Sequence, residues 1–346
     1  MNYSAFPRST FGFRASIALL PLIFAVLPAG CSSKSEVVAP LAVSAPLTTP
    51  VAAVVPQPSP ETVVWSDPSM GEPRGEFKTY HGPFDSGPTS VTVDGLPEHK
   101  WVRVRFKLLV MGKWNGSSRA WGPHLWSLHL HGAQQLMIAS FCNMGKETAS
   151  WPQSFPDDYP WGVHYAFTGG TALDADMPFR APAEDTGYSV SSTVYPVEVV
   201  FPHTGKSMRL NFDGVYWAPP QEIGHRWGVA DFEYVTTTEP VALAEGEMEQ
   251  LWSELASEDA VVANAAMWRM ISTGEKVAAF IDEMVARFPE GAPVPDELKV
   301  TNRYEALRLR RAVKIIRIVR PGDMWEARWA LSLAYPREDW ICDPVY

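Results

Sequence analysis

Residues 101–143 read WVRVRFKLLVMGKWNGSSRAWGPHLWSLHLHGAQQLMIASFCN, and this stretch decides the fold. Near its start, apolar residues at every second position alternate with Arg103, Arg105 and Lys107. Further on, apolar residues alternate in the same way with a serine and two histidines. Because successive side chains of a strand point to opposite faces, each run predicts a strand with one buried face. Two such strands indicate a half-buried antiparallel sheet, the unit of a β-sandwich.

Further short strands are predicted on both sides of this stretch, within residues 63–240. The expected strands are 76–80, 90–93, 101–110, 125–131, 135–141, 189–201, 208–212 and 229–236. Turn signals such as Asp94-Gly95 and Asp213-Gly214 separate them. This pattern predicts an antiparallel β-sandwich or jelly roll. Residues 151–185 lack periodicity and are too long for a passive connection, so we expect an elaborated loop that covers a face or lines a site.

The hydrophobic period changes to 3.6 residues after position 240, which predicts a small all-α domain over 241–346. The expected helices are 245–255, 261–271, 274–288, 304–319 and 323–334. The segment Ser257-Glu258-Asp259 looks like an N-cap with acidic residues in the first turn of the second helix, which suits the helix dipole. Short connections favour antiparallel helix pairs, as in a bundle or HEAT-like hairpins. The fourth helix is rich in Arg and Lys, which suits a salt-bridged solvated face and would also suit an acidic partner or anionic headgroups.

Residues 1–31 have the pattern of a lipoprotein signal peptide. Two arginines precede an apolar run, residues 15–27, that is too short to span a bilayer comfortably, and small residues come directly before Cys31. This ending resembles the bacterial lipobox, which implies lipidation of Cys31, with ordinary secretion as the alternative. Residues 32–62, rich in Ala, Val, Pro, Ser and Thr, predict an extended linker. We therefore expect a protein anchored by lipid in the cell envelope, at the outer membrane on its periplasmic or surface face.

Composition narrows the choice of partners. The 346 residues carry a formal net charge of -10, whereas a nucleic-acid binder usually has a basic excess. Nucleic acid is therefore not an expected partner. The chain has 14 Trp, most of them in the β region. Trp is favoured both in sandwich cores and on surfaces that stack flat apolar faces, so the count alone does not choose between core and ligand surface.

Several short motifs follow one another along the β region. They are Trp114-Asn115-Gly116, Gly122-Pro123-x-x-Trp126-x-Leu128, Phe141-x-Asn143, Gln153-Ser154-Phe155-Pro156, Phe201-Pro202-His203, Leu210-x-Phe212-x-Gly214 and Trp227-Gly228-Val229. In this order they resemble an uncharacterised module of exported bacterial lipoproteins that is similar to lectin-like jelly rolls. The module carries acidic residues at positions that hold Asn115 and His124 here, among others, so we do not expect a calcium site of that kind.

The helical region carries a second resemblance. Its motifs are Leu251-Trp252-x-x-Leu255, Ala265-x-x-Trp268 and Arg311-Ala312-Val313. They resemble a HEAT-like helical unit of the same sort of bacterial proteins. Together the two resemblances imply a jelly roll followed by a small HEAT-like or bundled domain.

Aromatic residues in loops are the candidates for ligand binding, because sugars offer apolar faces to Trp and polar edges to Asn, Asp and Arg. The candidate residues are Trp114, Asn115, Trp121, Trp151, Trp161 and Trp217. Core or loop packing is the alternative for each ring. A protein partner in the envelope would fit the same surface. The first functional hypothesis is thus a binding or scaffold protein without catalytic activity, with a glycan as ligand.

A metal-dependent envelope enzyme is the second hypothesis. His129 and His131 are two residues apart, a spacing that puts both on one strand face, and imidazoles suit Zn, Cu, Ni or Fe. Surface histidines on a polar strand face are the simpler interpretation. The sequence contains no GxSxG or HExxH motif, and no pair of carboxylates stands out for catalysis. We therefore predict no cofactor and favour the binding hypothesis.

Cys142 and Cys342 are the only thiols besides Cys31. In an oxidising compartment they could form a disulfide that ties the C-terminal tail to the sandwich. Alternatively, Cys142 is a small buried residue of a strand.

Overall fold

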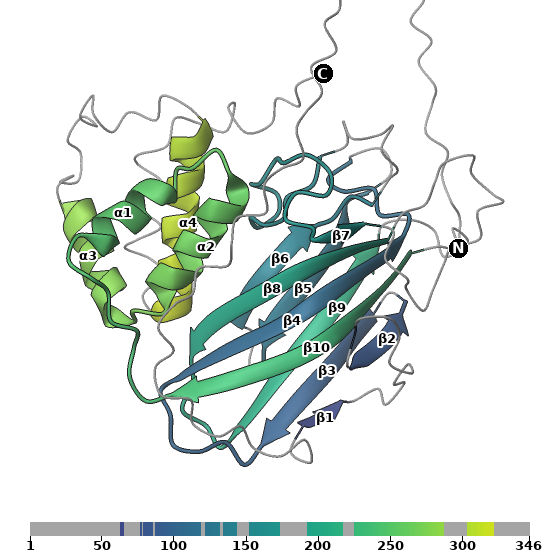
Figure 1. Cartoon of the computed structure of the whole chain (residues 1–346), viewed down its shortest axis with the longest axis horizontal. Helices are drawn as coiled ribbons and strands as arrows, with labels where there is room; N and C mark the ends of the chain where they lie inside the picture. Colours follow the sequence, from purple (N-terminus) through teal and green to yellow (C-terminus); the bar gives the residue numbers. More distant parts are fainter. Residues whose placement is uncertain are drawn as a thin grey trace, which may run out of the picture. The chain divides into compact units, whose positions relative to one another are not determined.

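A computed structural model gives the architecture of the chain. It describes residues 63–65, 77, 79–85, 87–118, 122–131, 134–143, 152–173, 192–216, 225–286 and 303–321. Over these residues, two antiparallel five-stranded sheets are followed by four helices (Figure 1). Several predictions fall outside the described residues: those for Cys31, Trp121, Trp151, Trp217, Cys342 and the helix at 323–334.

The strands form an antiparallel sandwich. One sheet has the order β1 (Val63–Trp65), β3 (Gly87–Asp94), β9 (Ser207–Tyr216), β5 (His124–Leu130) and β6 (Gln134–Ser140). The other has the order β2 (Tyr80–Phe84), β10 (His225–Thr237), β4 (Trp101–Gly112), β8 (Ser192–Pro202) and β7 (Ala172–Leu173). The predicted antiparallel sandwich is confirmed. The short strands β1 and β7 had no periodicity that could reveal them.

Inward-facing side chains of the two sheets form the core. In β4, Val102, Val104 and Phe106 are buried while Arg105 is exposed, as the two-residue alternation predicts. Trp126 of β5 is fully buried, with its ring centroid 5.8 Å from that of Phe106. Large aromatic groups of this kind account for much of the apolar area that the sandwich removes from water.

The end of β4 departs from simple alternation. Leu109 and Met111 belong to the outward-facing set, yet both are fully buried. They form a second, smaller cluster with Phe77 and Tyr80, which come from the segment before and at the start of β2. The outer face of this sheet is therefore covered at one end and solvated at the other.

The helices are α1 (Glu247–Glu254), α2 (Ala260–Ile271), α3 (Glu275–Ala286) and α4 (Arg303–Val319). All four were predicted to within a few residues. The predicted cap lies at the last residue of the segment 257–259. Asp259 caps α2, because its carboxylate accepts hydrogen bonds from the backbone N–H groups of Val261 (2.9 Å) and Val262 (3.4 Å). In the described part of the chain, no helix combines the length and the apolar character that crossing a membrane requires.

The helices pack against one side of the sandwich. Figure 1 shows them beside β8 and β6, α2 and α4 both contact β8, and the side-chain amide of Gln134 donates to the carbonyl of Ile318 at 3.2 Å. One continuous cluster of buried apolar side chains includes residues from both sheets and from all four helices. Near residue 240 the secondary structure changes, but the hydrophobic core continues across that position.

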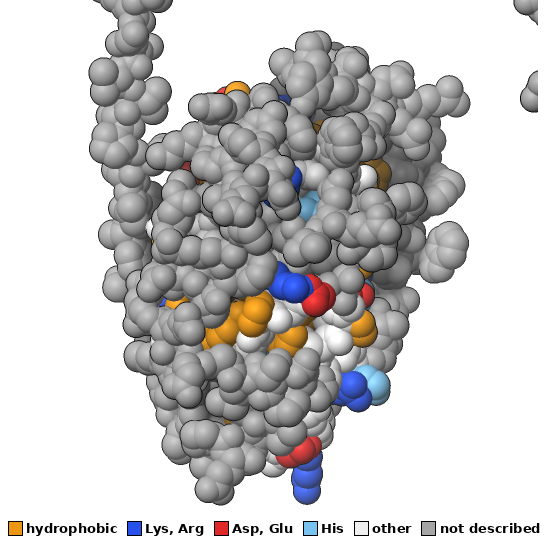
Figure 2. Space-filling model, turned by 90° about the vertical axis from the view of Figure 1, so that its right-hand side faces the viewer, with side chains coloured by type: hydrophobic (Ala, Val, Ile, Leu, Met, Phe, Trp, Pro, Cys, Tyr) orange, Lys and Arg blue, Asp and Glu red, His pale blue; other side chains and the backbone are white. Residues whose placement is uncertain are grey.

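Figure 2 shows the side of the sandwich that faces away from the helices. The described side chains visible there are a mixture of hydrophobic, basic and acidic groups. Hydrophobic side chains gather near the centre of the described part of this side, with basic and acidic side chains beside them (Figure 2).

Candidate functional site

The segment 152–173, called the edge loop below, covers the free edge of β6. The N–H of Ser140 donates to the hydroxyl of Ser154 at 2.8 Å, and the N–H of Tyr159 donates to the carbonyl of Ile138 at 2.8 Å. A bare edge strand would leave such backbone groups unpaired. The elaborated loop predicted from the sequence thus does cover part of the sandwich.

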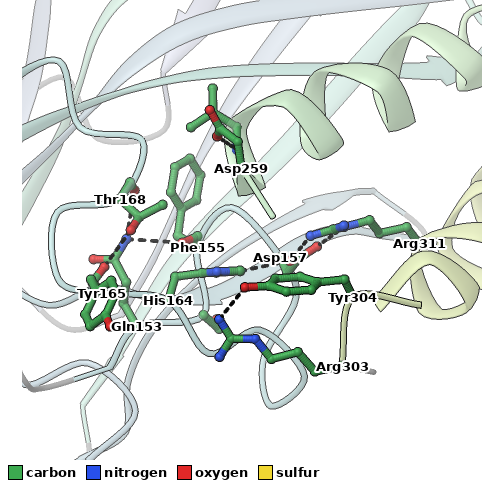
Figure 3. A network of polar contacts seen from close by, with 12 residues as sticks. Gln153, Phe155, Asp157, His164, Tyr165, Thr168, Asp259, Arg303, Tyr304 and Arg311 are labelled. Carbon is green, nitrogen blue, oxygen red and sulfur yellow. Dashed lines mark hydrogen bonds and ion pairs between the residues drawn. The ribbon is translucent and has the colours of Figure 1, made fainter. Parts of the chain in front are cut away.

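Gln153 joins the two ends of the edge loop to each other and to the sandwich. Its side chain is fully buried, and its amide oxygen accepts from the N–H groups of Cys142 (3.2 Å) and Phe167 (3.1 Å) and from the hydroxyl of Tyr195 (3.2 Å). Its amide nitrogen donates to two loop carbonyls, at 2.9 and 3.2 Å (Figure 3). Gln153 and His164 also exchange backbone hydrogen bonds of 2.9 and 2.8 Å, which close the loop on itself. Such complete pairing makes the loop rigid.

The inner side of the edge loop carries a buried ion pair with α4. Arg311 donates to both carboxylate oxygens of Asp157, at 2.7 and 2.5 Å, and His164 donates to one of them at 2.9 Å (Figure 3). Only 2% of the Arg311 side chain and 6% of the Asp157 side chain are exposed. Arg311 also donates to the carbonyl of Leu255, at the end of α1. One guanidinium therefore joins the edge loop, α1 and α4.

The pKa of Asp157 reflects this environment. Burial by itself raises the pKa of a carboxyl group, because it disfavours the charged form. The hydrogen bond from His164 and the charge of Arg311 outweigh burial and lower the pKa of Asp157 to about 2. The carboxylate is therefore ionised at any physiological pH and keeps its pairing with the helix.

A second pairing lies beside the first. Lys314 donates to Asp158 at 2.7 Å and Arg317 donates to it at 3.0 Å. Further along, Arg320 pairs with Glu275 and Asp282 of α3 at 2.8 and 2.7 Å. The basic residues in the C-terminal half of α4 and just after it thus meet carboxylates of the same chain, as the salt-bridge interpretation predicted. Arg311 and Lys314 are buried, however, so the expected solvated face is wrong for these two residues.

The outer side of the edge loop exposes large apolar side chains. Trp161 is 39% exposed, Val163 is 41% exposed and Tyr165 is 80% exposed. Because His164 points inward to Asp157, its two neighbours in this extended segment point outward. We call Trp161, Val163 and Tyr165 the aromatic ridge. The guanidinium of Arg310, from α4, lies 3.2 Å from the centre of the Trp161 ring, a cation–π contact.

Two other predicted ligand residues lie in the core. Trp114 is fully buried, and its indole N–H donates to the carbonyl of Arg226 at 3.1 Å. Asn115 is 6% exposed, and its backbone N–H donates to the imidazole of His124 at 3.0 Å. Neither side chain faces solvent, so for these two residues the alternative of core packing replaces the predicted role in ligand binding. Of the six predicted ligand-binding residues, Trp161 is the one that the described part of the structure places at the surface.

The two histidines of the metal hypothesis have different surroundings. His129 is half-buried on β5, whereas His131 is exposed in the turn that follows. Burial lowers the pKa of His129 and the charge of Arg317 lowers it further, while Asp213 opposes both effects. Across the described ranges, no group of three His, Cys, Asp or Glu side chains is arranged to hold a metal ion.

Cys142 is fully buried, next to Gln153, and its proposed partner Cys342 is outside the described residues. The disulfide stays a prediction.

Sequence reasoning did not identify the side chains that build the surface around Trp161. Gln153 and Arg311 each belong to a motif noted in the sequence, but nothing in either motif indicated that Asp157, His164 and Arg311 would meet. The available signal for this contact was a pair of acidic residues in a loop without periodicity, together with a basic helix far along the chain. No protein-family model matches the chain, and no curated protein matches it. Functional inference therefore depends on the geometry around the edge loop.

Proposed function

We propose that this chain is a lipid-anchored protein of the bacterial cell envelope that binds a glycan and catalyses no reaction. The observation that carries the proposal is the aromatic ridge, where Trp161 and Tyr165 are exposed to solvent on a loop whose base is held by the fully paired side-chain amide of Gln153. Aromatic rings offer the apolar faces of sugars a flat surface to stack on.

Rigidity makes the ridge suitable for binding. Gln153 fixes the base of the edge loop, and the pairing of Asp157 with Arg311 fixes its inner side. A surface that is already ordered loses little conformational entropy when a ligand binds, so more of the contact free energy appears as affinity. Exposed aromatic side chains on a rigid support are a feature that core packing does not explain.

The finer fold assignments belong to the same proposal. A lectin-like jelly roll is supported by the two antiparallel five-stranded sheets, whose order brings strands distant in sequence next to each other. A HEAT-like arrangement is supported by the contacts of α1 with α2 and of α3 with α4. The motif order in the sequence supports both.

The lipid anchor has a direct test. Cells that express the full chain would be fed an alkyne-tagged fatty acid, and the protein would be examined for the label. We expect label on the native chain and none on the Cys31→Ser variant. A native chain without label would contradict lipidation and leave ordinary secretion.

Glycan binding is tested on a glycan array with the purified native protein and the variants Trp161→Ala and Tyr165→Ala. We expect enrichment of at least one glycan class, reduced about tenfold by either variant. The matched control is Val215→Ala, which changes a side chain that is 39% exposed on β9. An array without enrichment over buffer, or enrichment that the ridge variants and Val215→Ala reduce equally, would refute the proposal.

A further inference from the structure

Two loops cross between the sheets at the end of the sandwich where the chain leaves for the helices. Residues 95–100 join β3 to β4, and residues 203–206 join β8 to β9, so each loop passes from one sheet to the other. Backbone hydrogen bonds connect the two loops: the N–H of Leu96 donates to the carbonyl of Lys206 at 3.0 Å. The N–H of His203 donates to the carbonyl of Lys100, also at 3.0 Å. Figure 1 shows β10 ending beside the start of β4 at this end.

A pair of histidines joins the same two loops through their side chains. His99 is 3% exposed and His203 is half-buried, and Nε2 of His99 lies 2.8 Å from Nδ1 of His203. The ring planes differ by 15° and the ring centres are 5.1 Å apart, so the two rings lie edge to edge with a hydrogen bond between them. A transition metal bound by both nitrogens would hold them more than about 3 Å apart, since each metal–nitrogen bond is about 2.0–2.1 Å long. The spacing therefore fits a shared hydrogen.

The two outer ring nitrogens decide how many protons the pair can hold. Nδ1 of His99 lies 2.6 Å from the carbonyl oxygen of Pro97, and a carbonyl can only accept, so this nitrogen carries a hydrogen. In the neutral pair, Nε2 of His99 is then the acceptor and Nδ1 of His203 is the donor. A first proton can be taken up at Nε2 of His203, because a backbone hydrogen bond with Ser207 favours the charged form of that ring. A second proton makes both facing nitrogens donors, which breaks the bond between the rings.

The surroundings of His203 disfavour its protonation at neutral pH. Burial lowers the pKa of His203, the charge of a protonated His99 lowers it further, and the hydrogen bond with Ser207 opposes both effects. The segments around the pair carry exposed charged side chains, and none of these is a cause of the pKa shift of His203; they are Asp94, Glu98, Lys100, Lys206 and Glu239. His203 is therefore neutral at pH 7 and takes up a proton only as the pH falls below about 6.5.

We infer that His99 and His203 form a pH-sensitive clasp, which joins the two crossing loops while the pair holds at most one extra proton and opens when both rings are charged. Two like charges at hydrogen-bond distance in a largely buried site drive the opening. Its effect extends to the helices, because Trp101 directly follows the first loop and packs on Gly274, in the turn between α2 and α3. A Cβ at Gly274 would lie 2.8 Å from the Trp101 ring. Opening of the clasp therefore loosens the junction between the sandwich and the helices.

The protonation steps are tested by NMR titration of the imidazole Cε1–H signals in the purified native protein. The variants His99→Gln and His203→Asn identify the two signals. We expect both rings to report the same two steps, separated by more than about one pH unit, as coupled groups do. In His203→Asn, the signal of His99 should show a single step. Two independent single-step titrations in the native protein would overturn the shared hydrogen and with it the clasp.

Opening of the clasp is tested by hydrogen exchange in peptides that contain Leu96 and His203, whose N–H groups bond across the two loops. After correction for the intrinsic effect of pH, we expect exchange below the second protonation step to be about tenfold faster than at pH 7.

His203→Asn is the decisive variant for the opening. The Asn amide can donate its N–H to a neutral His99 or accept through its oxygen from a protonated one, so exchange in this variant should not accelerate in acid. His131→Asn, at an exposed position of a turn, is the matched control and should behave as the native chain does. Equal acceleration in the native chain and His203→Asn, or none in the native chain, would overturn the inference.

Discussion

Replacing Asp157 by Asn tests whether a buried ion pair holds α4 on the sandwich. Asn keeps the shape of the side chain but leaves the charge of Arg311, which is 2% exposed, without its counter-charge. Removing one partner of a buried pair costs about 3–5 kcal/mol, because the remaining charge stays out of water. We expect a loss of this size in the free energy of unfolding. With a urea slope of about 2–3 kcal/mol/M, the midpoint falls by about 1–2.5 M.

The control for this experiment is Glu198→Gln. Glu198 pairs with Arg105 at 2.5 Å and Arg103 at 3.5 Å, but 36% of its side chain is exposed. Exposed pairs contribute below about 1 kcal/mol. Urea unfolding followed by Trp fluorescence measures both variants. If Asp157→Asn shifts the midpoint no more than Glu198→Gln does, the buried pair does not hold the helices and the reasoning fails.

The same variant predicts a pH dependence. The pKa of Asp157 falls from 3.8 to about 2 on folding. A carboxyl group whose pKa is lowered by folding stabilises the native state above its unfolded pKa, and this contribution disappears as the pH falls from about 4 to 2. The contribution is on the order of 2–3 kcal/mol. The difference in stability between the native chain and Asp157→Asn should therefore narrow over that range, and a constant difference would contradict this assignment.

Three more substitutions test other parts of the molecule by urea unfolding. Gln153→Leu leaves buried backbone groups unpaired and should lower the free energy of unfolding by about 2–5 kcal/mol. Its control is Gln250→Leu, at an exposed position of α1, which should lower it by less than about 0.5 kcal/mol. Asp259→Ala removes the cap of α2 and should cost about 1 kcal/mol. Burial, with smaller effects from His124 and Lys113, lowers the pKa of His225 to about 3. Below about pH 6.5 the unfolded chain therefore binds a proton that the native chain does not, so the free energy of unfolding falls as the pH is lowered from about 6.5 towards 3. His225→Gln should reduce that fall, whereas His131→Gln, at an exposed position, should not.

Local periodicity predicted the longer strands and all four described helices, but it missed the short strands β1 and β7 and placed the strand that is β2 (Tyr80–Phe84) at 76–80. Arg105 alternates with buried neighbours because a strand turns successive side chains to opposite faces, wherever the strand lies. Asp259 begins α2 because its carboxylate reaches N–H groups two and three residues away. Local geometry did not predict the burial of Met111, since Phe77 and Tyr80 that cover it come from another strand and the segment before it.

The candidate site depends on contacts between residues far apart in the chain. Trp114 and Trp161 are the same residue type, and both lie in segments without regular periodicity, yet one is fully buried and the other is 39% exposed. The sequence could identify both as candidates for ligand binding, because an indole ring can stack on a sugar wherever it lies in the chain. Choosing between them required knowing which surfaces the sheets and helices cover. Asp157 and Arg311 are 154 positions apart, and a pairing at that separation is specified by how folded layers pack, which no short-range pattern encodes.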